Sequence, residues 1–247
     1  MKHLGLMLFL LLPLSGCVSN ETEETDILSD QKYFPLRKGK FIEYVADSIV
    51  FRQGSLLDST RFEAREEILT EGQDSLGPFY TILRSHRPGA GEPWVPYASY
   101  TARVFQNRAI VNEANVHFIK LVFPLLPGIS WNGLGLVRPD QVFNVEGESV
   151  EIYRDWENFK AGESPGGFTS GNLVFDDVVS ILQTDEENLL AKRYSLEKYA
   201  AGTGLVYKEM IILDCNNNVN DCAAVNLPWS QRATKGYIYR QTITRHN

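Results

Sequence analysis

The chain lacks most of the features from which an activity is usually inferred. It has only four histidines in 247 residues, and no His-x-x-x-His spacing, HExxH motif or Ser-His-Asp order occurs. Lysine and arginine form no cluster, and Asp and Glu outnumber them by 31 to 24, which argues against nucleic-acid binding. No repeat of solenoid or propeller period is present. The sequence therefore carries no motif that identifies an enzyme class, and location and fold are the properties it predicts best.

Long apolar runs are scarce as well. The run Leu4 to Leu14 follows the basic Lys2 and is too short to span a bilayer. It ends in Leu14-Ser15-Gly16-Cys17, and small residues before a cysteine at this place are typical of a bacterial lipobox. We therefore expect residues 1–16 to be a lipoprotein signal peptide and Cys17 to be the acylated first residue of the mature protein. Several acyl chains would anchor it firmly, because one chain alone binds a membrane only marginally.

The residues after Cys17 predict where the anchor lies. In bacterial lipoproteins generally, an aspartate directly after the cysteine favours the inner membrane, and this chain has Val18 there. We therefore expect a lipid-anchored protein of the outer membrane, and the sequence leaves open whether it faces the periplasm or the exterior. Residues 17–31 are acidic and polar without periodicity, which predicts a flexible tether.

Cysteine is rare, with three in the chain. Once Cys17 is assigned to lipid, Cys215 and Cys222 remain as a pair. An exported protein folds in an oxidising compartment, where disulfides are the default. We therefore expect a disulfide between Cys215 and Cys222 that closes a short loop and stabilises a hairpin.

Acidic residues suggest two further chemistries. Asp214, Asn216 and Asn218 have the spacing of the first ligands of an EF-hand, but Val219 stands where that loop needs glycine. Neighbouring carboxylates such as Glu66-Glu67 could indicate glycoside hydrolysis. Adjacent residues of a strand, however, face opposite sides and seldom share a site. We therefore expect no metal, no cofactor and no catalysis, with a hydrolase as the remaining enzymatic alternative.

The rest of the sequence has the pattern of strands. Residues 32–247 are rich in β-branched and aromatic residues with period-2 alternation, which predicts one all-β domain of about a dozen mainly antiparallel strands. A short helix is expected near residues 195–200 or in the 60s, and a loop at 158–167. The expected strands are 41–51, 61–69, 78–87, 97–106, 109–113, 116–123, 142–145, 150–156, 171–188, 191–201, 204–213 and 236–244.

Three blocks of the chain resemble small envelope lipoproteins of the Bacteroidota. Phe34 to Tyr44 is similar to their opening P-L-x-x-G-x-x-W-x-Y, with Phe41 in place of the tryptophan. Pro127 to Gly133 resembles their G-x-x-W-x-G turn, and Tyr199 to Glu209 resembles their Y-A-x-G-V-G-L-V-Y-K-E segment. The resemblance implies a strongly curved antiparallel sheet with one or two short helices, a half-barrel or open barrel like the carriers of the LolA and LolB type. It implies a fold and a location and no activity.

A strongly curved sheet has a concave face, and aromatic side chains are the best candidates to line it. We expect Trp94, Tyr97, Tyr100 and Trp131 to contact an apolar molecule or a glycan there. The predicted function is a non-enzymatic, membrane-anchored lipoprotein that binds such a ligand. The alternative is a structural or assembly partner in an outer-membrane protein complex. An apolar cavity would favour the ligand, and a filled core with an exposed apolar patch would favour the protein partner.

Overall fold

The structure is a computed structural model. It describes residues 29–247, apart from 53–56, 114–115, 136, 139, 146, 155, 157, 164, 216–221 and 223–226. The predicted signal peptide, Cys17 and most of the predicted tether lie outside the described residues. Within the described ranges, no helix is long and apolar enough to cross a membrane.

The fold is all-β, as the sequence predicts, and the helical segments are short. These are the 3-10 helix η1 (Gln31–Tyr33) and the helix α3 (Trp229–Arg232). The strands are β1 (Phe41–Phe51), β2 (Leu57–Asp74), β3 (Gly77–Arg87), β4 (Val95–Phe105), β5 (Arg108–Glu113), β6 (Val116–Val122), β7 (Ser130–Trp131), β8 (Phe143–Val145), β9 (Glu148–Val150), β10 (Phe159–Ala161), β11 (Gly166–Ser170), β12 (Leu173–Glu187), β13 (Ala191–Ala200), β14 (Gly204–Asp214) and β15 (Lys235–His246).

Thirteen strands form one sheet in the order β6-β5-β4-β3-β2-β1-β15-β14-β13-β12-β10-β7, with β11 paired to β12 outside this path. Every pairing in it is antiparallel, and β8 and β9 form a hairpin of their own. Because β1 pairs with both β2 and β15, it joins an N-terminal meander to a C-terminal one.

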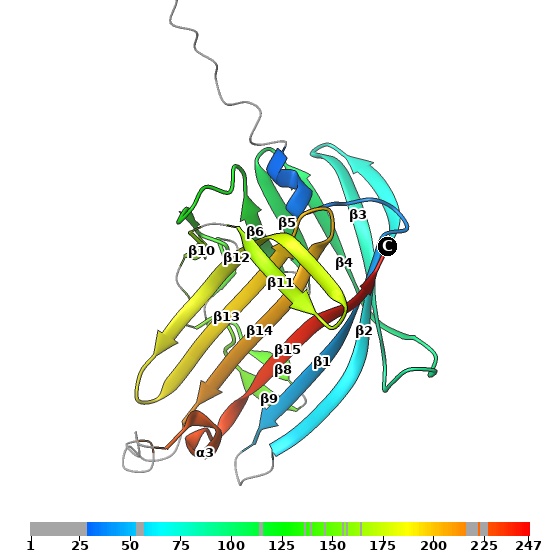
Figure 1. Ribbon diagram of the computed structural model, residues 1–247. Coiled ribbons are helices and arrows are strands. Elements are labelled where there is room, and N and C mark those ends of the chain that lie inside the picture. Colours follow the sequence, from blue (N-terminus) through cyan, green and yellow to red (C-terminus); the bar gives the residue numbers. More distant parts are fainter. Residues whose placement is uncertain are drawn as a thin grey trace, which may run out of the picture.

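The sheet curves strongly and almost closes on itself (Figure 1). Register shifts interrupt the pairs β1–β15, β2–β3, β3–β4, β5–β6, β11–β12, β12–β13 and β13–β14. Such bulges bend strands and increase their twist. The two ends of the sheet meet beside β6 and β7. There the Ile119 amide donates to the Gly133 carbonyl over 3.0 Å, and Trp131 Nε1 donates to the Ile119 carbonyl over 2.8 Å. This open barrel is the architecture predicted from the sequence.

The interior differs at its two ends. At the end near α3 it is filled by the segment that follows β8, where Val150 and Ile152 pack against Met210 and Ile212 of β14. The opposite end is covered by η1 and the residues after it (Figure 1). Charged and polar side chains lie inside as well, since the β13 row Arg193, Ser195, Glu197 and Tyr199 is at most 3 % exposed. Buried charges are costly without partners, so these side chains direct attention to the interior.

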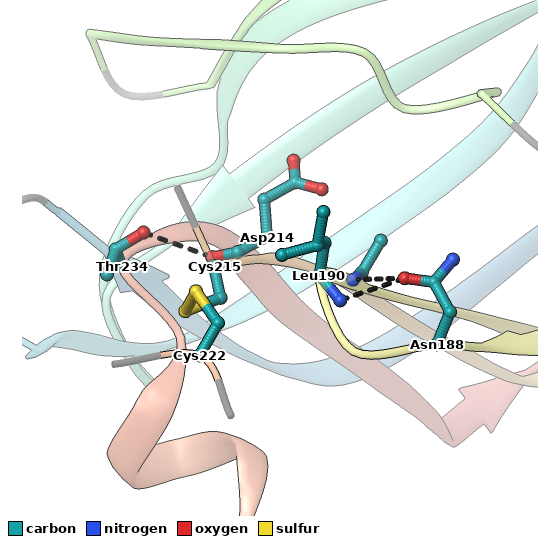
Figure 2. The surroundings of a disulfide bond; sticks show 7 residues. Asn188, Leu190, Asp214, Cys215, Cys222 and Thr234 are labelled. Carbon is teal, nitrogen blue, oxygen red and sulfur yellow. Dashed lines mark hydrogen bonds between the residues drawn. A yellow bond between two sulfur atoms is a disulfide. The ribbon is translucent and has the colours of Figure 1, made fainter. Parts of the chain in front are cut away.

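The disulfide lies where β14 ends (Figure 2). Cys215 and Cys222, the pair expected from the sequence, have an S–S distance of 2.09 Å and pack with Trp229 of α3. The Cys215 amide donates to the Leu190 carbonyl, and the Thr234 hydroxyl donates to the Asp214 carbonyl. The disulfide therefore packs the end of β14 against α3. Hydrogen bonds connect the same end of β14 to Leu190 and Thr234.

The calcium alternative receives no support from the described part of that loop. Asn216 and Asn218 lie outside the described residues. The Asp214 carboxylate accepts hydrogen bonds from Arg193 Nη2 at 2.6 Å and Arg154 Nη2 at 2.7 Å. The Asp214 side chain is therefore engaged by two guanidinium groups.

Several local predictions were wrong. Both stretches expected to form a short helix, 195–200 and the 60s, belong to β13 and β2. Each pairs with a strand on both sides, and this tertiary pairing outweighs the helix propensity of their Glu and Arg residues. A strand was expected at 150–156, but β9 already ends at Val150. The loop expected at 158–167 contains β10 and the start of β11.

Candidate functional site

A cavity of about 100 Å³ lies inside the open barrel, beneath residues 34–42. A cavity needs about 10–15 Å³ of such space to hold a single water molecule, so this cavity is large enough for several. Its wall next to the covering segment is apolar, because Phe34 and Leu36 pack there against Ile68 and Ile82. Its other wall is polar and consists of Tyr44, Glu66, Arg84, Tyr100, Glu113, Lys120, Glu197, Tyr199 and Lys208.

Residues 30–40 cover this cavity, and we name them the lid segment. The Tyr33 hydroxyl donates to one oxygen of Asp177 on β12, and Lys32 Nζ donates to the other over 2.7 Å. The Gly202 amide donates to the Lys32 carbonyl over 2.8 Å. Two further bonds fix the ends of the segment, Leu125 N to Asp30 Oδ2 at 2.7 Å and Gly39 N to Ile68 O at 2.8 Å. Asp30, expected to belong to the tether, is thus bound to the loop between β6 and β7.

Two of the three blocks that carry the resemblance meet at the lid segment. Lys40 Nζ donates to the Gly202 carbonyl at 3.3 Å, and the Tyr44 hydroxyl donates to the Leu205 carbonyl at 3.0 Å. Gly202 has φ +73° in the turn between β13 and β14, a conformation that favours glycine. The glycine-rich turn of the third block therefore holds the lid segment of the first, although about 160 residues separate them in the chain.

Arg84 organises one half of the polar wall. It lies opposite Glu66 in the β2–β3 ladder and donates to Glu66 Oε1 from Nε at 2.9 Å. Its Nη1 donates to Glu113 Oε1 at 2.5 Å. Burial alone would raise the pKa of Glu113, but the charges of Arg84, Lys208 and Lys120 outweigh it, so this pKa lies below its ordinary value. Glu113 is therefore ionised at neutral pH.

Glu197 organises the other half. Its Oε1 accepts a hydrogen bond from Lys120 Nζ at 2.7 Å, and its Oε2 accepts one from the Tyr199 hydroxyl at 2.6 Å. Lys208, its cross-strand neighbour on β14, lies 3.8 Å from Oε1. Burial would raise the pKa of Glu197, but Lys120 and Lys208 lower it below the ordinary value. Both acids are thus held as carboxylates by cations inside the barrel.

The tyrosines of the polar wall are neutral. Burial, and then the negative charge of neighbouring glutamates, raises the pKa of Tyr44, Tyr100 and Tyr199 well above the ordinary value. Their hydroxyl groups are therefore hydrogen-bonding groups across the physiological pH range.

A second, smaller cavity of about 30 Å³ adjoins the first. The two cavities share Glu113, Lys120 and Lys208, so these three side chains stand at their boundary. The remaining lining residues of the smaller cavity are Phe118, Tyr153, Trp156, Phe159, Gln183 and Met210. The larger cavity thus has an apolar wall, the smaller cavity has a mostly aromatic lining, and the shared charged residues lie between them.

The structure places the four predicted ligand residues in different surroundings. Tyr100 lines the larger cavity, beneath the Arg84 guanidinium. Tyr97 is 50 % exposed on β4, and Trp94 lies before β4 under the guanidinium of Arg87. Trp131 is buried where the ends of the sheet meet. Of the four, only Tyr100 lies in the cavity wall, so they do not form one site.

Sequence reasoning missed the charged residues of the polar wall. Glu66 was considered only as part of the neighbouring pair Glu66-Glu67, and Lys120 lies within the strand expected at 116–123 without having been singled out. The available signal was a charge on the apolar face of an alternating strand, because Lys120 lies between the buried Phe118 and Leu121. Lys208 lies in a block quoted for the resemblance, but a single block does not reveal that its lysine faces inward.

The chain matches no protein-family profile and no curated protein. Two solved structures have a similar fold. A protein from Bacteroides fragilis, described as exported and YmcC-like in fold, is 12 % identical with a TM-score of 0.42, over 86 % of this chain and 97 % of that chain. A protein from Parabacteroides distasonis, described as a lipoprotein, is 11 % identical with a TM-score of 0.41, over 87 % of this chain and 98 % of that chain. Similarity at this level carries no conclusion about function.

Proposed function

We propose that this chain is a membrane-anchored envelope lipoprotein of the outer membrane that binds a small, mainly apolar molecule inside its open barrel. The observation that carries the proposal is the cavity of about 100 Å³ with an apolar wall under a lid segment and a polar wall opposite. Ligand sites are typically apolar hollows with a few placed polar groups. The glycan alternative has less support, because Trp94 and Tyr97 lie away from this cavity.

The path of the chain supports a cavity near the membrane. The lid segment directly follows the predicted tether, and η1 lies at the covered end of the barrel (Figure 1). A lipid anchor at Cys17 would therefore attach to the same end of the domain as the entrance of the cavity. An apolar molecule that leaves the membrane would reach this entrance by a short path.

We propose binding rather than catalysis because of the state of the acids. A general acid that works near neutral pH needs a raised pKa, whereas cations lower the pKa of both Glu113 and Glu197. Both carboxylates are also occupied by hydrogen bonds from Arg84 and Lys120. This arrangement suits a fixed polar wall better than a hydrolase.

Native mass spectrometry with lipid extraction tests the proposal. The full chain carrying Cys17→Ala should appear in the soluble periplasmic fraction and, after purification, carry a bound apolar molecule. Ile82→Trp fills the apolar wall and should abolish that additional mass, and Val95→Trp, on the exposed part of β4, should not. Unliganded mass in the Cys17→Ala chain and in both of its derivatives would contradict the binding function, and membrane retention of Cys17→Ala would contradict the anchor.

A further inference from the structure

The charged side chains around the boundary of the two cavities form ion pairs, and Lys208 is the one whose pair, with Glu197, is not also a hydrogen bond. Arg84 binds Glu66 and Glu113, and Lys120 binds Glu197. Lys208 Nζ is 3.8 Å from Glu197 Oε1, an oxygen that already accepts from Lys120. Among the described residues, Lys208 therefore donates no hydrogen bond to a carboxylate. It retains 19 % of its side-chain surface and lines both cavities.

Other polar groups without partners near Lys208 are donors as well. Gln241 lies directly opposite Lys208 on β15, and its Oε1 accepts from the Tyr239 hydroxyl at 2.7 Å. Gln183 lines the smaller cavity, and its Oε1 accepts from the Ser195 hydroxyl at 2.8 Å. In both residues the buried Nε2 finds no acceptor within the described chain, and the same holds for Trp156 Nε1. N–H groups that donate no hydrogen bond therefore line the smaller cavity on Gln183 and Trp156, and Gln241 places another next to Lys208.

We propose that Lys208 binds the carboxylate of an amphipathic ligand whose apolar chain occupies the larger cavity. The inference rests on the proposed function and adds the chemistry of the ligand's polar end. A carboxylate has about four acceptor positions, so it can accept from an ammonium group and amide N–H groups together. Charge-assisted bonds of this kind are roughly twice as strong as neutral ones. A cavity of about 100 Å³ suits a short apolar chain.

The electrostatic state of Lys208 agrees with this role. Burial, and then the positive charge of Lys120, lowers its pKa below the ordinary value, and Glu197 and Glu113 compensate only in part. A carboxylate at Nζ would therefore stabilise the ammonium form. Glu197 and Glu113 stabilise the ammonium form only in part, and their oxygens already accept hydrogen bonds from Lys120 and Arg84.

Octanoate and octan-1-ol are suitable probes, because they share a chain length and differ in the head group. Calorimetric titration of the full chain carrying Cys17→Ala should show octanoate binding more tightly. Lys208→Met should weaken octanoate by about tenfold or more, the effect of losing one charge-assisted bond, and change octanol by less than about threefold. Lys208→Arg should retain most of the octanoate affinity. Lys198→Met, on the same sheet near Phe168, is the matched control and should leave both affinities unchanged.

The outcomes separate the two proposals. Equal affinity for both probes, unchanged by Lys208→Met, would overturn the carboxylate inference and leave the binding function intact. Binding of neither probe would overturn both. If Lys208→Met does not fold, the carboxylate inference is tested instead by carbon-13 NMR of carboxyl-labelled octanoate bound to the chain with native Lys208. The carboxyl group should stay ionised at a pH where free octanoate is protonated, and titration at the free value would overturn the inference.

Discussion

At the scale of residues, the interior of this barrel depends on matched charges. Glu197 is 1 % exposed and holds Lys120 at 2.7 Å. Replacing one partner of a buried pair leaves the other charge uncompensated, which typically costs about 3–5 kcal/mol. We therefore expect Glu197→Gln to lower the free energy of unfolding by about that amount at pH 7, measured by urea unfolding. Asp140→Asn removes an exposed surface pair with Arg138 and should leave this free energy nearly unchanged.

The pH dependence of the same variant gives an independent check. The pKa of Glu197 is lower in the folded protein than in the unfolded chain, where it is about 4.3. Its contribution to stability is therefore complete above that value and is lost as the pH falls through the folded pKa. The difference between the native chain and Glu197→Gln should shrink below about pH 4. A constant difference from pH 7 to pH 3 would show that Glu197 stabilises the fold by packing and not by charge.

At the scale of elements, the lid segment is the part whose movement would admit a ligand. Asp177 holds η1 through Tyr33 and Lys32, and Tyr33 also packs in a core cluster with Val179 of β12. Asp177→Ala should raise local opening, so that the amides of Phe34 and Gly202, bonded to Gln31 and Lys32, exchange hydrogen about 5–30 times faster. Amides in the β1–β2 ladder should keep their rates.

Asp176→Ala is the matched control for the lid segment. Asp176 is the exposed neighbour of Asp177 on β12, so its removal should leave the exchange of Phe34 and Gly202 unchanged. Equal acceleration in both variants would mean that the carboxylate of Asp177 does not hold the lid segment.

Most strands could be predicted from the sequence, but the contacts between residues far apart in the chain could not. Alternation alone locates β1, β3 and β14 to within a residue or two. It separates the two faces of a strand but does not tell which face is inside, so it does not reveal that Glu197 and Lys208 face the interior. The cavity arises from contacts between Leu36 and residues far along the chain, such as Ile82. Such contacts leave no local pattern, whereas Tyr100 was identified because an aromatic residue in a strand is conspicuous by itself.

At the scale of the whole molecule, two hydrogen bonds and a shared core cluster join the two ends of the curved sheet. Trp131 Nε1 donates to the Ile119 carbonyl, and the Ile119 amide donates to Gly133. Gly133 is required for this approach, because a Cβ atom there would lie 2.3 Å from the ring of Phe159. Trp131→Phe keeps an aromatic ring beside Phe159 and removes the N–H donor. The closure of the barrel can thus be weakened without removing its aromatic packing.

Trp131→Phe should therefore open the molecule at one seam. We expect a loss of about 1–3 kcal/mol in the free energy of unfolding, since the carbonyl of Ile119 loses its partner, together with faster hydrogen exchange of the Ile119 amide. Trp94→Phe changes a tryptophan outside the barrel that contacts Arg87, and it should leave that exchange rate unaltered. If the Ile119 amide exchanges at the same rate in both variants, the indole does not hold the ends together. The curvature would then follow from the bulges of the strands, among them β2, β4, β6, β12, β14 and β15.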